Sequence, residues 1–214
     1  MTTHTATFAL GCFWGPDARF GLMPGVLRSR VGYAGGTVPA PTYRTIGDHY
    51  EVVEVDFDPE QLPYPVLVER FFAAHDPTKF KAKKQYRSAV LTRDEAQLDV
   101  ARRLAREEGG HRDAEIRTVI KPLDAFHWAE DDHQKWRLRR YEALTELLVE
   151  RLGDERAFAC EPAISRLNGY AGGYGDPDEL RAELAALDLP ETPGGPLTEE
   201  LIREHRIQAE RRAP

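Results

Sequence analysis

The residue best suited to chemistry is a cysteine near the start of the chain. The sequence reads Gly-Cys-Phe-Trp-Gly over residues 11–15, directly after an apolar run over residues 8–10. An ionised cysteine is a sulfur nucleophile, and the N-terminus of a helix favours the thiolate. The two aromatic side chains offer an apolar wall, and the glycines permit a tight turn between a strand and a helix. We therefore interpret Cys12 as a reactive thiol and not as a small residue of the core.

A carboxyl group is predicted on the inner face of a strand. Residues 50–57 alternate as a strand does, which places Glu51 on the same apolar face as Val53 and opposite to Glu54. A carboxyl on an apolar face loses its hydration, so its pKa rises and it remains a proton donor near neutral pH. The alternative is an internal ion pair with Arg87, which would lower the pKa of Glu51 instead.

Several short segments occur together and in a fixed order. They are GCFWG at 11–15, VGYAGG at 31–36, PTY at 41–43, HYEVV at 49–53, DP at 58–59, HDPT at 75–78, QYRS at 85–88 and AEDDHQ at 129–134. In these segments, which span roughly residues 5 to 140, the chain resembles A-type peptide methionine sulfoxide reductases. The resemblance implies thiol-dependent reduction of methionine S-sulfoxide, free or in proteins, to methionine, as a repair of oxidative damage. It assigns no bound cofactor.

The chemistry of a sulfoxide explains why such residues are needed. Its sulfur is partly positive and its oxygen is a strong acceptor, so a thiolate attacks the sulfur only when a donor protonates the departing oxygen. We expect Cys12 to be the nucleophile, Glu51 the proton donor, and the phenols of Tyr43 and Tyr86 further donors to the same oxygen. Taken alone, either phenol would be interpreted as an ordinary half-buried tyrosine.

The aromatic neighbours of Cys12 are expected to bind substrate. Phe13 and Trp14 would hold the S-methyl group against the electron-rich faces of their rings. The products would be methionine and a sulfenic acid on Cys12. Selectivity for the S epimer follows from the resemblance alone.

Regeneration of the thiol has two candidate routes. Many relatives carry resolving cysteines in a Gly-rich C-terminal tail, but the Gly- and Tyr-rich segment 168–175 contains none, and the second thiol of this chain is Cys160. Either Cys160 forms a disulfide with Cys12, or an external thiol (thioredoxin or a small thiol) reduces the sulfenic acid directly. We favour the external thiol, because Cys160 lies on a segment predicted to be an ordered helix end.

One basic segment departs from the family pattern. Residues 79–84 read Lys-Phe-Lys-Ala-Lys-Lys, where relatives usually have an acidic stretch that includes an Asp. The segment is either a solvated loop or a site that favours a substrate carboxylate or an acidic thiol donor. Asp132 also replaces a common Tyr. These departures leave open a different small methyl sulfoxide as substrate, and a redox-sensing thiol protein is a further alternative.

No metal site is predicted. His49, His75 and His133 lack the spacing of metal ligands, and the acidic residues 130–132 are interpreted as the start of a helix.

The elements that must position these residues alternate along the chain. Strands are predicted over residues 5–10, 26–33, 50–57, 86–92 and 115–120, and helices over 16–22, 65–75, 94–108, 128–152, 177–187 and 197–211. This order predicts an α/β protein (an α+β two-layer sandwich) in which helices cover a mixed sheet with a ferredoxin-like core. We expect a catalytic domain over 1–155 and an irregular and helical extension over 156–214, with a linker at 190–196.

Composition narrows the class of protein further. The 214 residues carry a formal net charge of -7, which argues against a nucleic-acid partner or an anionic membrane. No apolar stretch approaches a membrane span, the N-terminus lacks the regions of a secretory signal, and two cysteines make no disulfide framework. We therefore expect a cytoplasmic protein whose partners are its sulfoxide substrate and a thiol donor.

Overall fold

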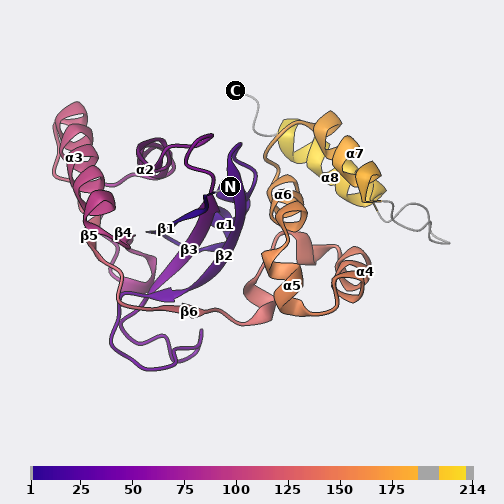
Figure 1. Cartoon of the computed structure of the whole chain (residues 1–214), viewed down its shortest axis with the longest axis horizontal. Helices are drawn as coiled ribbons and strands as arrows, with labels where there is room; N and C mark the ends of the chain where they lie inside the picture. The colour runs from indigo at the N-terminus through magenta and orange to yellow at the C-terminus, as the bar shows by residue number, and fades with distance from the viewer. Residues whose placement is uncertain (1, 188–197, 211–214) are drawn as a thin grey trace.

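The computed structural model describes residues 2–187 and 198–210, and these form one mixed sheet surrounded by helices (Figure 1). The strand order is β5-β4-β1-β3-β2-β6. The strands are β1 (His4–Leu10), β2 (Val26–Ala34), β3 (Tyr50–Phe57), β4 (Ser88–Thr92), β5 (Val119–Pro122) and β6 (Phe126–Trp128). The pair β4–β5 is parallel and the other pairs are antiparallel.

The four central strands and two helices make the predicted ferredoxin-like unit. Helix α1 (Trp14–Gly21) follows β1, and α2 (Tyr64–Ala73) lies between β3 and β4. The resulting order β1-α1-β2-β3-α2-β4, with β1 and β3 in the centre of the sheet, confirms the predicted fold class. Helix α3 (Glu95–Arg112) then packs beside α2.

The main apolar core lies between the sheet and these three helices. Phe8 of β1 stacks on Phe20 of α1 at 5.4 Å between ring centroids and on Phe71 of α2 at 5.1 Å. All three rings are fully buried, as are Val53 and Val55 of β3. Complete burial of an aromatic or aliphatic side chain contributes roughly 1.5–3 kcal/mol, so this cluster fixes where α1 begins.

Strand β3 is buried on both faces, which the alternation of its sequence does not predict. Glu54 and Asp56, expected on the side away from the apolar face, are 2% and 3% exposed. The guanidinium of Arg30 bridges them, at 2.6 Å to Glu54 and 2.7 Å to Asp56. Because both carboxylates are paired, they are buried without leaving an unpaired charge.

The predicted helix over residues 128–152 is wrong before residue 142. Trp128 instead ends β6 and pairs with Gly32 of β2. The side-chain amide of Gln134 accepts from the backbone N–H of Val31 at 3.0 Å and donates to the Val31 oxygen at 2.8 Å, as a neighbouring strand would. Lys135 follows with a left-handed φ of 56°, which interrupts any continuous helix.

The C-terminal part of the chain forms a second cluster of helices beside α1 and β2 (Figure 1). These are α4 (Glu142–Leu152), α5 (Glu155–Cys160), α6 (Pro162–Ala171), α7 (Pro177–Ala186) and α8 (Glu199–Glu210). Their apolar cluster includes residues from both sides of position 155, for example Leu144 and Phe158. The predicted linker at 190–196 and the ends of the last predicted helix lie outside the described residues. No helix in the described part of the chain is long and apolar enough to cross a membrane.

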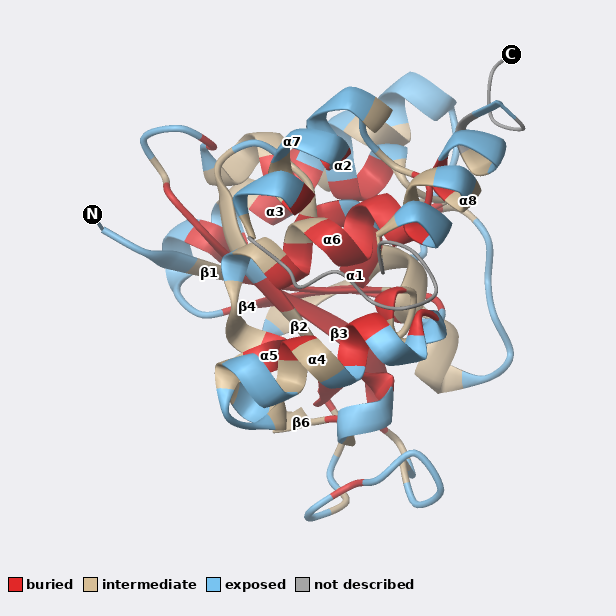
Figure 2. Cartoon of the chain, turned by 90° about the vertical axis from the view of Figure 1, so that its right-hand side faces the viewer, coloured by how far each residue is buried: buried red, intermediate tan, exposed pale blue. Residues whose placement is uncertain are grey.

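Half of the Gly- and Tyr-rich segment 168–175 belongs to α6. Residues 168–171 form the last turn of α6, which is buried against α1 (Figure 2). Gly169 has no side chain at the point of closest approach: a Cβ there would lie 2.6 Å from Leu22 Cβ and 2.8 Å from the Ala18 oxygen. The glycine therefore sets the distance between the two helices.

We expect Gly169→Ala to lower the free energy of unfolding by about 1–3 kcal/mol, because α6 and α1 would have to separate. The matched control is Gly110→Ala in α3, where a Cβ would meet nothing within 4 Å. That change should be neutral or stabilising by up to about 1 kcal/mol through helix propensity. Urea unfolding of both variants measures the difference. Equal effects of the two substitutions would contradict the close packing of α6 on α1.

Candidate active site

Cys12 lies in the turn between β1 and α1. Gly11 has a φ of 120°, a conformation that only glycine adopts easily, and it turns the chain so that α1 begins at Trp14. The Cys12 residue is exposed, and its thiol lies close enough to the carboxyl of Glu51 for the two groups to influence each other's pKa. Loss of hydration around the sulfur, together with the charge of Glu51, raises the pKa of Cys12 above its usual value, although the Trp14 backbone N–H and Arg137 act to lower it. The Trp14 backbone N–H at the start of α1 acts in the expected direction, since it favours the thiolate, but loss of hydration has the larger effect.

Glu51 is positioned at the end of β3 directly behind this turn. Its side chain accepts from the Phe13 backbone N–H at 3.1 Å and from the Gln85 amide at 3.0 Å. The residue is 1% exposed, and burial raises the pKa of its carboxyl, in the predicted direction. The alternative pairing does not form, because Arg87 donates to the backbone oxygens of Lys81 and Ala82.

Two phenols complete the group. The phenol of Tyr86 lies near that of Tyr43, and the charges of Glu51 and Cys12 act on it. Burial and these neighbours raise the pKa of Tyr86 to about 12, so the phenol stays protonated at neutral pH. The four residues predicted to act on the sulfoxide thus come together from four separate segments of the chain.

The two aromatic neighbours of Cys12 have different surroundings. Phe13 is 1% exposed and packs on Tyr33 and His133, with ring centroids 5.9 and 5.4 Å away. Trp14 is only half-buried and stacks on Trp136 at 4.2 Å with an angle of 7° between the ring planes. Phe13 therefore belongs to the wall behind the turn, while Trp14 retains accessible surface. Their roles in holding a methyl group stay predictions.

Three residues that support the site were quoted among the motifs without a role. Gln85 donates to Glu51, and His133 Nδ1 accepts from the Trp14 indole at 3.2 Å while its ring lies 4.8 Å from that of Tyr43. Glu130 accepts from the Tyr33 hydroxyl at 2.7 Å and from the Tyr43 backbone N–H at 2.8 Å. These contacts join residues far apart in sequence, so spacing alone could not have assigned them. Residues 131–133 form one turn of 3₁₀ helix and not the predicted longer helix.

The second thiol lies at the end of α5, near Lys135. Cys160 is the last residue of α5, is partly exposed, and is not bonded to Cys12. It lies close enough to the buried Lys135 ammonium to raise the pKa of that lysine, against the larger effect of burial, which lowers it. The predicted position of Cys160 at an ordered helix end is confirmed, and its part in resolving the sulfenic acid stays a prediction.

A buried ion pair holds α1 in place. Asp17 accepts from Lys135 Nζ at 2.9 Å and from the Ser29 hydroxyl at 2.6 Å, while its second oxygen accepts from the Asn168 amide at 3.0 Å. Lys135 and Asp17 are both essentially buried. The helix that carries Trp14 is thereby tied both to β2 and to α6.

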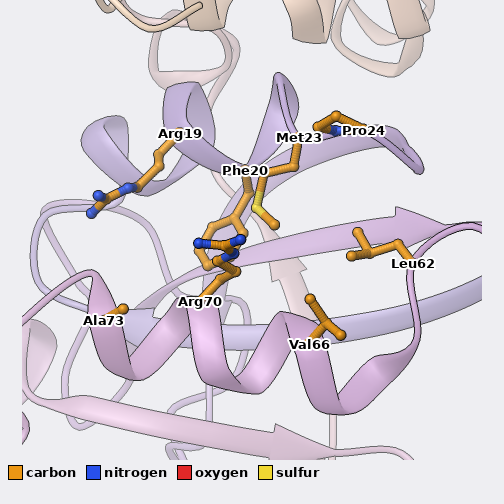
Figure 3. A pocket seen from close by; sticks show the side chains of 8 residues that line it. All are labelled: Arg19, Phe20, Met23, Pro24, Leu62, Val66, Arg70 and Ala73. Carbon is orange, nitrogen blue, oxygen red and sulfur yellow. The ribbon is translucent and has the colours of Figure 1, made fainter.

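A cavity of about 430 Å³ opens at the opposite end of α1 (Figure 3). It is lined by Arg19, Phe20, Met23, Pro24, Leu62, Val66, Arg70 and Ala73. It contains none of the residues assigned to sulfoxide chemistry, because Cys12 precedes α1 whereas the cavity lies at its last turn. Within the described residues, no group of three His, Cys, Asp or Glu side chains could hold a metal ion.

Comparisons with known proteins agree with the geometry. A family model described as peptide methionine sulfoxide reductase matches residues 4–158. Peptide methionine sulfoxide reductase A5 of Oryza sativa is 36% identical over 94% of this chain and 81% of its own length. Peptide methionine sulfoxide reductase of Drosophila melanogaster is 38% identical over 90% of this chain and 78% of its own.

Two solved structures share the fold. Methionine sulfoxide reductase A of Corynebacterium diphtheriae superposes with a TM-score of 0.56 at 34% identity, covering 63% of this chain and 73% of that one. Reduced Mxr1 from Saccharomyces cerevisiae gives a TM-score of 0.58 at 28% identity, covering 61% and 82%. The rice and fly proteins match a larger share of this chain than these two structures do.

The raised pKa of Glu51 makes protein stability depend on pH. The pKa of a Glu carboxyl in an unfolded chain is about 4.3, and the pKa of Glu51 in the folded protein is higher. At a pH below the unfolded pKa this difference adds to the free energy of unfolding, and the added stability is lost as the pH rises through the folded pKa. An amide does not ionise, so Glu51→Gln does not lose this stability. We therefore expect its free energy of unfolding to increase relative to that of the wild type as the pH rises from 4 to 8. Urea unfolding across this range tests it. A difference between the two proteins that does not change with pH would contradict the raised pKa.

Proposed function

The chain belongs to the peptide methionine sulfoxide reductase family, its activity is the reduction of methionine sulfoxide, and we propose that Cys12 performs it by taking up the sulfoxide oxygen. The observation that carries this proposal is the buried carboxyl of Glu51 directly behind the Cys12 turn, where it accepts from the backbone N–H of Phe13, the residue after Cys12, at 3.1 Å. A nucleophile and a proton donor side by side are what attack on a sulfoxide requires.

The proposed step transfers one oxygen atom and balances without a cofactor. The Cys12 sulfur attacks the sulfoxide sulfur while Glu51 gives a proton to the sulfoxide oxygen, and the proton of the Cys12 thiol returns the carboxyl to its starting state. The oxygen leaves with the Cys12 sulfur. A thiol and a methyl sulfoxide thus become a sulfenic acid and a thioether, so sulfur in the protein is oxidised and sulfur in the substrate is reduced.

The phenols of Tyr43 and Tyr86 are proposed to stabilise the oxygen as it accepts the proton. Hydroxyl groups that stay neutral can donate hydrogen bonds throughout the reaction, and the pKa of about 12 of Tyr86 keeps that phenol neutral. Trp14, with accessible ring surface beside Cys12, is proposed to hold the methyl group of the substrate, with Phe13 behind it. Family membership supports the S epimer and a role in repair of oxidised methionine.

We propose an external thiol as the reductant that regenerates Cys12. Two external thiols would reduce the sulfenic acid to the Cys12 thiol, with release of water and formation of their own disulfide. The exposure of Cys12 supports direct access by thioredoxin or a small thiol. The position of Cys160 at the ordered end of α5 supports the same route.

Variants of the proposed nucleophile and acid test the chemistry. We expect Cys12→Ser to abolish reduction of methionine S-sulfoxide, and Glu51→Gln to lower kcat about 10²–10⁴-fold, because the amide cannot supply the proton. The matched control is Glu60→Gln, since Glu60 is an exposed carboxyl. Methionine release is measured with dithiothreitol as reductant. Undiminished turnover by Glu51→Gln would rule out its role as the acid.

The route of regeneration is tested with Cys160→Ser. In the proposed route this variant keeps both its thioredoxin-linked turnover and its single-turnover yield of methionine within about twofold of the wild type. Mass spectrometry after incubation with substrate alone should then find a sulfenic acid on Cys12. A Cys12–Cys160 disulfide in the wild type, with loss of thioredoxin-linked turnover but not of the single turnover in Cys160→Ser, would show that Cys160 is the resolving thiol.

A further inference from the structure

The basic segment 79–84 places one ammonium group directly beside the nucleophile turn. Lys81 Nζ donates to the Leu10 backbone oxygen at 3.5 Å and lies 3.0 Å from the point that a Cβ on Gly11 would occupy. The ammonium is therefore no more than about 8 Å from the Cα of Cys12. No other lysine of the segment is recorded in contact with this turn.

We propose that Lys81 binds the carboxylate of the substrate, so that the enzyme prefers methionine sulfoxide with a free α-carboxylate to the same residue inside a peptide. The inference rests on the proposed function, because it concerns the molecule that Cys12 reduces. In methionine sulfoxide, Cγ, Cβ and Cα separate the sulfur from the carboxyl carbon by about 5 Å. A substrate whose sulfur meets Cys12 can therefore bring its carboxylate within reach of Lys81.

Within the part of the chain that the structure describes, Lys81 differs from Lys79 and Lys84 in having no carboxylate partner. It differs from Lys83 in its contact with the Cys12 turn. Lys79 is paired with Asp76 at 3.5 Å, and Lys84 is paired with Asp48 at 3.4 Å. Among the described residues, Lys81 has no carboxylate within ion-pair distance, and its side chain is exposed. An ammonium near the reaction centre without an anionic partner is suited to an anion supplied by the substrate.

The backbone that carries Lys81 is held in place. Arg87 Nε donates to the Lys81 oxygen at 2.8 Å, Arg87 Nη2 donates to the Ala82 oxygen at 3.1 Å, and the guanidinium lies 4.4 Å from the ring centre of Phe80. These contacts reduce the conformational freedom that binding would otherwise remove. Arg87 is thus a positioning residue for the segment and not a partner of Glu51.

The charges around Cys12 favour an anionic substrate. Arg137, whose guanidinium lies over the Trp136 ring, is near enough to Cys12 to lower its pKa. The acidic groups on the other side are already engaged: Glu130 accepts from Tyr33 and Tyr43, and Glu51 has a raised pKa. Lys81 and Arg137 therefore both favour an anion in the neighbourhood of Cys12.

Two substrates that differ only in charge test the proposal. They are N-acetyl-methionine S-sulfoxide, which has a free carboxylate, and its neutral N-methylamide, both reduced with dithiothreitol so that no protein donor takes part. We expect wild-type kcat/KM to be about fivefold higher for the carboxylate, as an exposed ion pair allows. In Lys81→Met this ratio should fall to about one, mainly through KM, and Lys81→Arg should restore it. The matched control Lys79→Met removes the same charge from the same segment and should keep the wild-type ratio.

The ratio separates this inference from its alternatives. A wild-type ratio near one, or a ratio that survives Lys81→Met, overturns the carboxylate site while turnover of the neutral amide upholds the proposed function. If Lys81 only stabilised the Cys12 thiolate, both substrates would slow equally, and the unchanged ratio would overturn the inference. A loss confined to thioredoxin-driven turnover, equal for both substrates, would assign Lys81 to an acidic donor and also overturn it. A wild-type protein that reduces neither substrate overturns the proposed function and this inference together.

Discussion

The buried carboxylate of Asp17 joins three parts of the fold at one point. It binds the Lys135 ammonium, the Ser29 hydroxyl of β2 and the Asn168 amide of α6. Removing two opposite charges from water costs several kcal/mol for each ion, and only good geometry with further hydrogen bonds offsets that cost. Lys135 also donates to the Ser29 backbone oxygen at 2.6 Å, so the ammonium is well satisfied. The orientation of α1, and with it the turn that holds Cys12, depends on this cluster.

Glu51 is a second buried carboxyl beside the same turn, and its neighbours differ from those of Asp17. Asp17 faces an ammonium, whereas Glu51 faces a backbone N–H and a neutral amide. Neutral donors stabilise a carboxylate less than a cation does, so burial prevails and the pKa of Glu51 is raised. One carboxyl therefore serves the fold as an anion, and the other can carry the proton that sulfoxide reduction needs.

Short-range patterns in the sequence predicted the central strands of the sheet but not β6, whose last residue, Trp128, was expected to begin a helix. Alternation of apolar residues predicted β3 over residues 50–57, with the bounds that the structure has, and placed Glu51 on the inner face. The same reasoning failed where long-range contacts decide the conformation. The side chain of Gln134 pairs with β2 in place of a helix, and the Gly-rich residues 168–171 become buried in α6 once α1 is there to receive them. His133 and Gln85 escaped assignment for the same reason, since their partners come from distant segments.

The raised pKa of Cys12 changes how its reactivity is to be understood. A thiol activated by the helix N-terminus alone would be a thiolate at rest, open to any oxidant that reached this exposed position. Here the thiol lies near Glu51, and loss of hydration favours the protonated form of both groups. In the proposed mechanism, attack by the sulfur and protonation of the oxygen draw on this same pair of residues, so a substrate that accepts the proton also activates the nucleophile. Coupling the two events restricts the chemistry to molecules with a basic oxygen on an electrophilic sulfur, which is the defining feature of a sulfoxide.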